Sequence, residues 1–349
     1  MQVAFDGFDG YWVCDPAVQP PAETVVFYLH GGGFTMGNDF YNEADGSGST
    51  AFYLEFLMNV VETIPNHALR IFSLDYSLVP EARYPTQLQQ LAKAYEYLLS
   101  STPADKIVIA GDSAGASLLL SFLLHIIRPC PELEAASRPL STPAAVILIS
   151  PWCHIDSRHT PTSSAKAADE DFLDTAMLDE YARLYTGATR PQSSSSLLFP
   201  FQFYIAAFKG LCRQLFDSPP YYTSKWITRA KLSVLESRQD PRDSAIHSYL
   251  CKSPYRNPFS ALDHPDWLAQ ALPSNAMVIY GEKEIMAGDI IEFITGLKKV
   301  SRGEVEVHTR WKLGWHAWPT VVMYLGKDLT ETRSGVNLIA DFITRTMQN

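Results

Sequence analysis

The sequence has few cysteines, no excess of positive charge and no long hydrophobic run. Its five cysteines form no C-x-x-C pair, which favours buried thiols in a reducing compartment over a disulfide framework or a zinc site. The net charge of −10 argues against nucleic acid or an anionic membrane as a partner. The longest apolar run, 118–127, is too short to span a bilayer, and the first residues lack the features of a signal peptide. The sequence therefore predicts a soluble, intracellular and cytoplasmic protein, with endoplasmic-reticulum association only if an upstream segment is missing.

The residues that are abundant describe a globular α/β protein. Hydrophobic residues make up 46% and charged residues 19% of the 349 positions, which is the balance of a chain with a large core. β-branched and aromatic runs alternate with segments of helical spacing, and this alternation predicts a mostly parallel, doubly wound sheet. The predicted strands are 24–29, 70–76, 107–110, 144–150, 276–280 and 304–309, with a short edge strand at 10–14, and the predicted helices are 51–64, 85–99, 290–298 and 335–347.

Residues 153–255 interrupt this alternation and contain no clean strand. We interpret them as a mainly helical cap, inserted between a first part of the core, 1–152, and a second part, 256–349. Within the cap, the acidic stretch 169–172 predicts the start of a helix. The aromatic stretch 197–212 would suit a membrane-surface lid, but a buried helical cap is favoured and nothing else supports membrane association.

A strand, a tight turn and a helix are predicted over 106–127, and the turn carries the G-x-S-x-G pattern of a nucleophile elbow. Such a turn lifts its serine clear of the sheet at the positive end of the following helix. The turn is also too crowded for side chains two residues before and after the serine. The pattern therefore predicts Ser113 as the nucleophile, with Gly111, Asp112 and Gly115 supporting the turn.

A second glycine-rich turn follows the strand predicted at 24–29, where His30 precedes three consecutive glycines and Phe34. A simple turn needs one glycine, whereas three expose a run of unhindered backbone N–H groups. They do so at the carboxyl end of a strand, where α/β sheets carry their sites. The loop is therefore predicted to belong to the same site as the elbow.

A serine nucleophile needs a base that is oriented by a third group, and on this type of elbow the acid and then the histidine follow the serine in the chain. His316 lies in the loop after the last predicted strand, among bulky aromatic residues that would restrict water, and is predicted as the base. Glu284 and Asp289 follow the strand at 276–280 and are both candidates for the acid, with Glu282 a more distant third. No H-x-x-x-H or H-E-x-x-H pair is present, so nothing in the sequence supports a metal site.

Five stretches of the sequence form a combined signature: HGGGF at 30–34, DYSLVPEARYP at 75–85, GDSAG at 111–115, ISPW at 149–152 and GWHAWP at 314–319. Together they resemble the hormone-sensitive-lipase group of α/β-hydrolases. The ISPW stretch and the spacing look most like its steryl-acetyl-hydrolase-like branch. The resemblance extends over roughly 24–180 and 254–345, and the pairing of the HGGG and GDSAG motifs is specific.

The resemblance implies an α/β-hydrolase fold with an inserted cap and a serine–histidine–acid triad. The family places its acid in a pattern like D-P-L-x-D. Glu284 matches the first position with Glu in place of Asp, so Glu284 is preferred and Asp289, near the second position, is the alternative. The family's HGGG loop implies that Gly31, Gly32 and Ala114 bind an oxyanion through their N–H groups. His30 and Gly33 complete the motif.

The implied activity is a serine carboxylic-ester hydrolase that removes short acyl groups, such as acetyl, from a small hydrophobic alcohol without cofactor or metal. Two alternatives use the same fold: an arylformamidase-like amidase, and a non-catalytic ligand receptor, which would lack the catalytic histidine. The family also has a longer N-terminal segment than this sequence shows, and 189–247 matches nothing in its pattern. Those residues are interpreted either as a variation of the cap or as an artefact of the gene model, in which case an inactive product is a third alternative. The oligomeric state is left open.

Overall fold

The structure of the protein is a computed structural model. It describes residues 2–5, 7–13, 24–37, 50–64, 69–137, 139–155, 171, 173, 175–187 and 252–348. The segment 189–247, with its two interpretations, lies outside the described residues, as does the aromatic stretch 197–212. Of the proposed cap, the description covers its first residues, α5 (Thr175–Thr186) and the chain from 252 onward.

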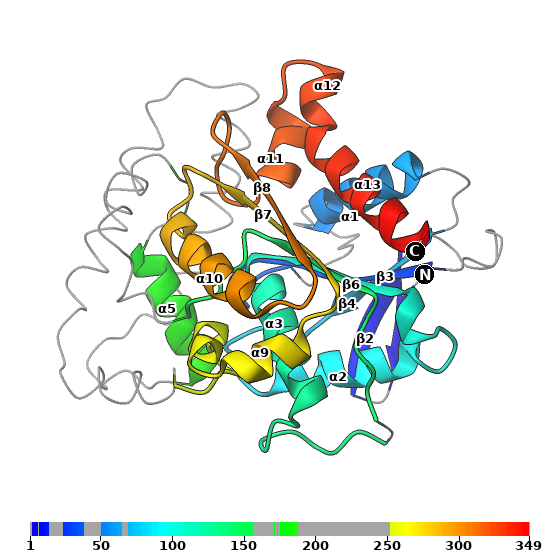
Figure 1. Cartoon of the computed structure of the whole chain (residues 1–349), viewed down its shortest axis with the longest axis vertical. Helices are drawn as coiled ribbons and strands as arrows, with labels where there is room; N and C mark the ends of the chain where they lie inside the picture. Colours follow the sequence, from blue (N-terminus) through cyan, green and yellow to red (C-terminus); the bar gives the residue numbers. More distant parts are fainter. Residues whose placement is uncertain are drawn as a thin grey trace.

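Eight strands form one mostly parallel sheet, in the spatial order β1-β2-β4-β3-β5-β6-β7-β8 (Figure 1). Six of them, β3 to β8, run parallel to one another, while β1 (Gln2–Phe5) and β2 (Phe8–Trp12) pair antiparallel at one end, with β2 antiparallel to β4. The parallel strands are β3 (Thr24–Leu29), β4 (Leu69–Asp75), β5 (Ile107–Asp112), β6 (Ala145–Ile149), β7 (Asn275–Gly281) and β8 (Glu304–Arg310). The carboxyl ends of these strands therefore meet at one edge of the sheet, where an α/β fold carries its site.

Helices cover both faces of the sheet, and each face has its own hydrophobic core. One core packs α2 (Thr86–Leu98), α3 (Ser113–Ile127), α9 (Pro265–Ala271) and α10 (Ala287–Val300) against the sheet. The other packs α1 (Thr50–Thr63), α11 (Trp318–Leu325) and α13 (Ser334–Gln348) against the opposite face. Three short helical elements are also described: α12 at Leu329–Thr332 and 3₁₀ turns at Ala104–Lys106 and Pro258–Asp263. The predicted α/β-hydrolase fold with a doubly wound sheet is confirmed.

The start of the chain corrects one expectation from the sequence. The edge strand predicted at 10–14 is β2 (Phe8–Trp12), and it is not at the edge, because β1 (Gln2–Phe5) pairs outside it. Gly7, with φ of +95°, allows the tight reversal between the two strands. A four-residue strand is too short to show a period of its own, so β1 has no signal in the sequence.

The described helix of the inserted segment packs on the glycine-rich loop. Tyr185 of α5 stacks on Phe34 with ring centroids 3.8 Å apart. A Cβ atom on Gly33 would lie 2.3 Å from the ring of Tyr181, so only glycine lets α5 approach this closely. The chain after β6 contributes Trp152 to the same core. This part of the insertion is therefore integrated with the core, while the boundaries 153 and 255 stay predictions.

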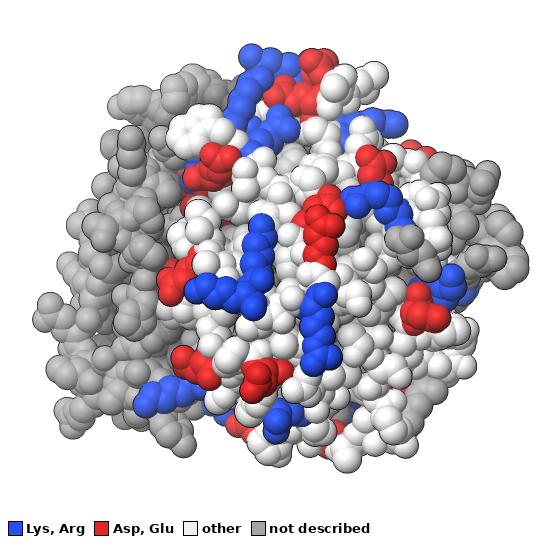
Figure 2. All heavy atoms as spheres, viewed as in Figure 1, with Lys and Arg blue, Asp and Glu red and all other residues white. Residues whose placement is uncertain are grey.

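Two features of the described residues concern membrane and nucleic-acid partners: the distribution of surface charge and the length of the apolar helices. Lys and Arg are interspersed with Asp and Glu on the described part of the face shown in Figure 2. Of the helices that the structure describes, none combines the length and the apolar character needed to cross a membrane.

Candidate active site

Ser113 occupies a strained turn at the carboxyl end of β5, where α3 begins. Its φ of +50° lies in the left-handed region that residues other than glycine rarely adopt. A Cβ atom on Gly115 would lie 2.2 Å from the carbonyl oxygen of Leu29, and one on Gly111 would lie 2.9 Å from the same oxygen. Both glycines of the motif are therefore required by backbone contact with the end of β3, as the nucleophile elbow predicts.

The glycine-rich loop begins with a histidine that is buried and neutral. His30 is 1% exposed and stacks on Tyr76, whose hydroxyl donates to the carbonyl oxygen of His30 at 2.7 Å. Burial lowers the pKa of His30 to about 4, although its contact with the Gly31 carbonyl opposes the shift. Gly32 and Gly33 follow with φ of +100° and +62°. His30 therefore holds the loop in place and carries no charge at neutral pH.

Asp112 joins the glycine-rich loop to the elbow. Its Oδ1 accepts a hydrogen bond from the Tyr28 hydroxyl at 2.6 Å and another from the N–H of Gly31 at 2.9 Å. This geometry differs from the expectation that Gly31 binds the oxyanion, because its N–H already donates to a buried carboxylate. The N–H groups of Gly32 and Ala114 are the other two predicted donors, and Ala114 lies in the first turn of α3, where N–H groups have no acceptor within the helix.

His316 and Glu284 form a buried ion pair at the same edge of the sheet. The Nδ1 of His316 lies 3.3 Å from the Oε2 of Glu284. Glu284 is in the turn between β7 and α10 and its side chain is 0% exposed, and His316 is in the loop after β8 and its side chain is 5% exposed. Two residues 32 positions apart therefore meet because their parallel strands are neighbours in the sheet.

The surroundings of the pair shift both pKa values upward. Burial raises the pKa of the Glu284 carboxyl, and the contact with His316 opposes this. Burial alone would lower the pKa of His316, but the hydrogen bond and charge of Glu284, with the charges of Asp171 and Asp112, outweigh it. The net pKa of His316 is therefore above its ordinary value of 6.5.

The other two candidate acids have different partners. Asp289, in the first turn of α10, lies 3.7 Å from the Nδ1 of His154, and both side chains are buried. Glu282 accepts a hydrogen bond from the Thr309 hydroxyl at 2.7 Å. Of the three carboxylates predicted from the sequence, the geometry brings Glu284 to His316.

The loops that carry the acid and the base are joined through their backbones. Lys283 N–H donates to the carbonyl oxygen of Gly314 at 2.9 Å, and Glu282 N–H donates to that of Arg310 at 2.9 Å. A Cβ atom on Gly281 would lie 2.1 Å from the Gly314 oxygen. The two loops are thus in direct contact just before each catalytic candidate.

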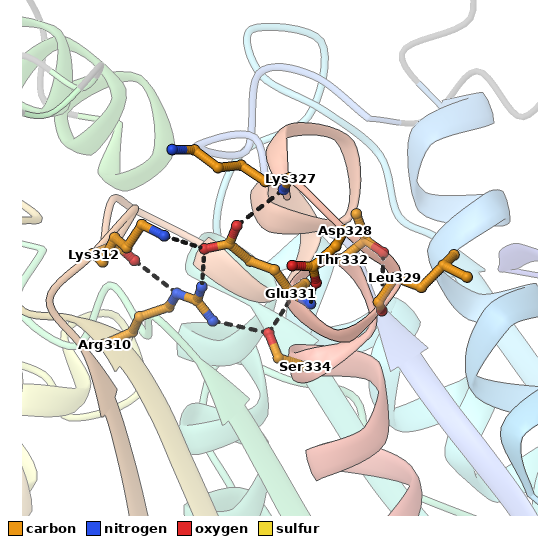
Figure 3. Close-up of polar contacts among 8 residues, drawn as sticks. All are labelled: Arg310, Lys312, Lys327, Asp328, Leu329, Glu331, Thr332 and Ser334. Carbon is orange, nitrogen blue, oxygen red and sulfur yellow. Dashed lines mark hydrogen bonds and ion pairs between the residues drawn. The ribbon is translucent and has the colours of Figure 1, made fainter.

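A polar cluster supports the outer end of the histidine loop (Figure 3). Arg310, the last residue of β8, donates from Nε to the Lys312 carbonyl at 2.7 Å. Glu331 of α12 accepts from Arg310, from the Lys312 ammonium and from the N–H of Lys327, at 3.0, 3.0 and 2.9 Å. Arg310 and Lys312 are at the start of the loop that leads to His316. The cluster therefore holds the start of this loop, several residues before His316 itself.

Two supporting residues were not assigned to the site from the sequence. Ser150, with φ of +43°, accepts the N–H of Ala317 on its Oγ at 2.9 Å, and it opposes the rise in the pKa of the Glu284 carboxyl. Its signal is its place in the ISPW stretch at the end of β6. Asp171 belongs to the acidic stretch that predicts a helix start, but α5 begins at Thr175 and the Asp171 carboxylate instead contacts both site loops. No local pattern distinguishes such an aspartate.

The described side chains give no support for a metal site. Among them, no group of three His, Cys, Asp or Glu residues is arranged to hold a metal ion. Cys130 and Cys153 are buried free thiols, and the other three cysteines lie outside the described residues.

The model of a protein family described as having the α/β-hydrolase fold matches residues 26–216, more than half of the chain. The chain belongs to this family. It is 30% identical over 173 residues to an acetyl-hydrolase of Streptomyces hygroscopicus, covering 48% of each chain. It is 31% identical over 114 residues to an acetyl esterase of Salmonella schwarzengrund, covering 31% of each chain.

The fold agrees with that of solved esterases. An esterase from the bacterial hormone-sensitive lipase family has a TM-score of 0.63 and 20% identity, with 99% of this chain and 84% of that chain covered. These findings support the resemblance to the hormone-sensitive-lipase group, while the steryl-acetyl-hydrolase-like branch stays a prediction. The chain spans about half, or less, of the length of the curated relatives that it matches.

Proposed function

We propose that the protein is a serine hydrolase of carboxylic esters. Ser113 attacks the ester carbonyl while His316 takes the proton from its hydroxyl and passes it to the leaving alcohol. Glu284 holds the imidazole in the required tautomer and stabilises its charged form. Water, activated by the same histidine, then releases the acid from the acyl-enzyme. The observation that carries this proposal is the buried His316–Glu284 pair, with 3.3 Å between Nδ1 and Oε2.

The oxyanion that forms on the carbonyl is assigned to the N–H groups of Gly32 and Ala114. The family's HGGG motif supports Gly32, the place of Ala114 in the first turn of α3 supports the second donor, and the positive end of α3 adds to their effect. Gly31 keeps Asp112 in register with the loop through its own N–H. Each donor of this kind contributes about 3 kcal/mol to lowering the barrier, so the loss of either is expected to slow turnover hundreds-fold.

For the substrate we propose a short acyl ester, acetyl above all, of a hydrophobic alcohol. The names of the relatives, an acetyl-hydrolase and an acetyl esterase, support the acyl group, and the resemblance to the steryl-acetyl-hydrolase-like branch supports a hydrophobic alcohol.

The test is hydrolysis of p-nitrophenyl esters from acetate to decanoate by the wild type and by Ser113→Ala. We expect turnover that falls with acyl chain length in the wild type and is lower by about a million-fold in Ser113→Ala, because the members of a triad act as a unit. Turnover that rises with chain length would replace the short-acyl proposal by a lipase.

The two alternatives give different results in the same assay. Aryl formamides tested beside the esters would be the better substrates of an amidase. A well-folded wild type that hydrolyses neither class would overturn the enzyme proposal and favour the ligand receptor. The presence of a paired His316 argues against a receptor, which would lack it.

A further inference from the structure

One carboxylate contacts the two loops that carry the proposed acid and base. Oδ2 of Asp171 accepts a hydrogen bond from the N–H of Ile285 at 2.9 Å, and its Oδ1 accepts one from the N–H of His316 at 3.3 Å. Ile285 immediately follows Glu284. The two acceptor oxygens of a single side chain are thus bonded to the backbone next to the acid and at the base itself.

The two contacts act on the backbone next to the acid and at the base itself. The hydrogen bonds from Lys283 and Glu282 join the same loops, but they lie before the acid and at the outer part of the histidine loop. Hydrogen bonds from N–H groups to an ionised carboxylate are stronger than those between neutral groups, and the bond from Ile285 at 2.9 Å has the length typical of them, while that from His316 is longer at 3.3 Å. Asp171 therefore fixes the backbone at the point where the Nδ1–Oε2 distance is set.

Asp171 belongs to the segment inserted between β6 and η4 (Pro258–Asp263), the 3₁₀ turn that precedes α9, not to either catalytic loop. α5 of that segment begins four residues later and packs on the glycine-rich loop through Tyr181 and Tyr185. The inserted segment therefore contacts the oxyanion loop at one place and the acid and base loops at another.

We propose that Asp171 is a positioning residue, which holds the Glu284 and His316 loops in register and makes the triad depend on the placement of the inserted segment. The proposal rests on the proposed function for its effect on catalysis, whereas its structural part does not. Three carboxylates act on His316: Glu284 after β7, Asp112 at the end of β5 and Asp171 from the insertion. Loss of the Asp171 charge removes one of the three influences that raise the pKa of His316.

The test compares kcat, KM and the pH dependence of kcat/KM for the wild type, Asp171→Asn and Asp171→Ala with p-nitrophenyl acetate. Asn keeps one acceptor oxygen and loses the charge, whereas Ala loses both. For Ala we expect kcat to fall on the order of a hundred-fold with KM nearly unchanged, because a small displacement of catalytic groups is costly. For Asn we expect a smaller loss of kcat. In both variants the acidic limb of kcat/KM should move to lower pH.

Glu292→Gln is the matched control, because it removes a negative charge from an exposed position of α10 without a contact to either loop. It should keep the wild-type kcat and pH profile. A loss of activity in Asp171→Ala with an unchanged pH profile, or one that a lower thermal midpoint fully accounts for, would assign Asp171 a merely structural role and overturn the proposal.

A second readout does not need activity. Amide hydrogen exchange of the peptides 284–288 and 314–318 should be faster in Asp171→Asn than in the wild type, and unchanged in Glu292→Gln. If neither the wild type nor any variant hydrolyses esters, the proposed function fails. The exchange rates would still show whether Asp171 holds the two loops. Unchanged exchange in both peptides would overturn the proposal that Asp171 holds the two loops, even in an active enzyme.

Discussion

The two halves of the site are held by different kinds of contact. On the nucleophile side, Ser113 is fixed by backbone approach, with Gly115 and Gly111 packed against the end of β3. On the acid–base side, backbone contacts join the two loops, but His316 itself is held by the side chains of Glu284, Ser150 and Asp171. The position of Ser113 therefore depends on the absence of side-chain atoms, whereas that of His316 depends also on the presence of charged and polar ones.

This difference determines what a substitution does to each half. Adding one methyl group on the nucleophile side forces backbone atoms apart and should reduce stability. Removing a charge on the acid–base side leaves the packing nearly unchanged and should reduce activity. Four predictions follow this division, and each could contradict it.

The largest effect is expected from Glu284→Gln, which keeps the shape of the side chain and removes its charge. The imidazolium formed during acyl transfer would lose its stabilising partner, so kcat should fall by about ten thousand-fold. Steady-state kinetics with p-nitrophenyl acetate measure it, and Asp289→Asn is the comparison because Asp289 pairs with His154. A larger loss in Asp289→Asn than in Glu284→Gln would exchange the two assignments.

On the nucleophile side, Gly115→Ala should lower the free energy of unfolding by about 3 kcal/mol, because its Cβ would lie 2.2 Å from one backbone oxygen and 2.5 Å from another. Gly296→Ala is the matched control. Its Cβ would lie 2.3 Å from the end of the Leu262 side chain, which can move. Urea unfolding should show a clearly smaller loss in Gly296→Ala. Equal losses would mean that the elbow also adjusts, and that backbone contact does not fix it.

The same division explains how much the sequence reveals. The elbow and the glycine-rich loop have local signatures, because backbone crowding requires glycine at fixed spacing around Ser113. β3, β5 and β7 also have local signals, as continuous apolar runs buried on both faces. The acid could be reduced to Glu284 or Asp289 but not chosen from spacing alone, since pairing across neighbouring strands decides which carboxylate reaches His316.

Contacts that join distant parts of the chain have no such signature. Asp171 is 114 positions from Ile285 and 145 from His316, and nothing in the acidic stretch around it indicates those partners. The N–H of Gly31 is another example. Its acceptor, Oδ1 of Asp112, is 81 positions away in the sequence, and only the tertiary structure brings the two groups together. The motif predicted the loop, and the tertiary structure decided the use of each N–H group.

The pH dependence sharpens the comparison, because the nucleophile side carries a neutral histidine and the acid–base side a titrating one. Protonated His316 cannot accept the Ser113 proton, so kcat/KM should fall as the pH decreases through the pKa of His316. That pKa is raised, so the midpoint should lie above 6.5, and it should move lower in Glu284→Gln if residual activity is measurable.

The other buried histidine provides the contrast. His30, with a pKa of about 4, stays neutral over this range and should add no second limb above pH 5. Because its pKa is lower in the folded than in the unfolded chain, its contribution to stability should be lost as the pH falls from about 6.5 to 4. A midpoint of kcat/KM at or below 6.5 would show that the charge of Glu284 does not dominate the environment of His316.

The smallest effect is expected at the surface end of the histidine loop. Glu331→Gln weakens the contacts to Arg310 and Lys312 shown in Figure 3, and hydrogen bonds to the N–H of Lys327 and to Lys312 lower the pKa of the Glu331 carboxyl. Its stabilising effect should therefore be present at neutral pH and vanish as the carboxyl is protonated in acid. The thermal midpoint should fall slightly, and less in high salt, because exposed ion pairs are screened.

For kcat we expect no change in Glu331→Gln, because Asp171 and the backbone contact between Lys283 and Gly314 hold the loop between this cluster and His316. Lys299→Gln, at the end of α10, is a control that removes a charge from an exposed position. A fall in kcat that is specific to Glu331→Gln would show that the placement of His316 depends on charged contacts as far as the surface cluster around Arg310.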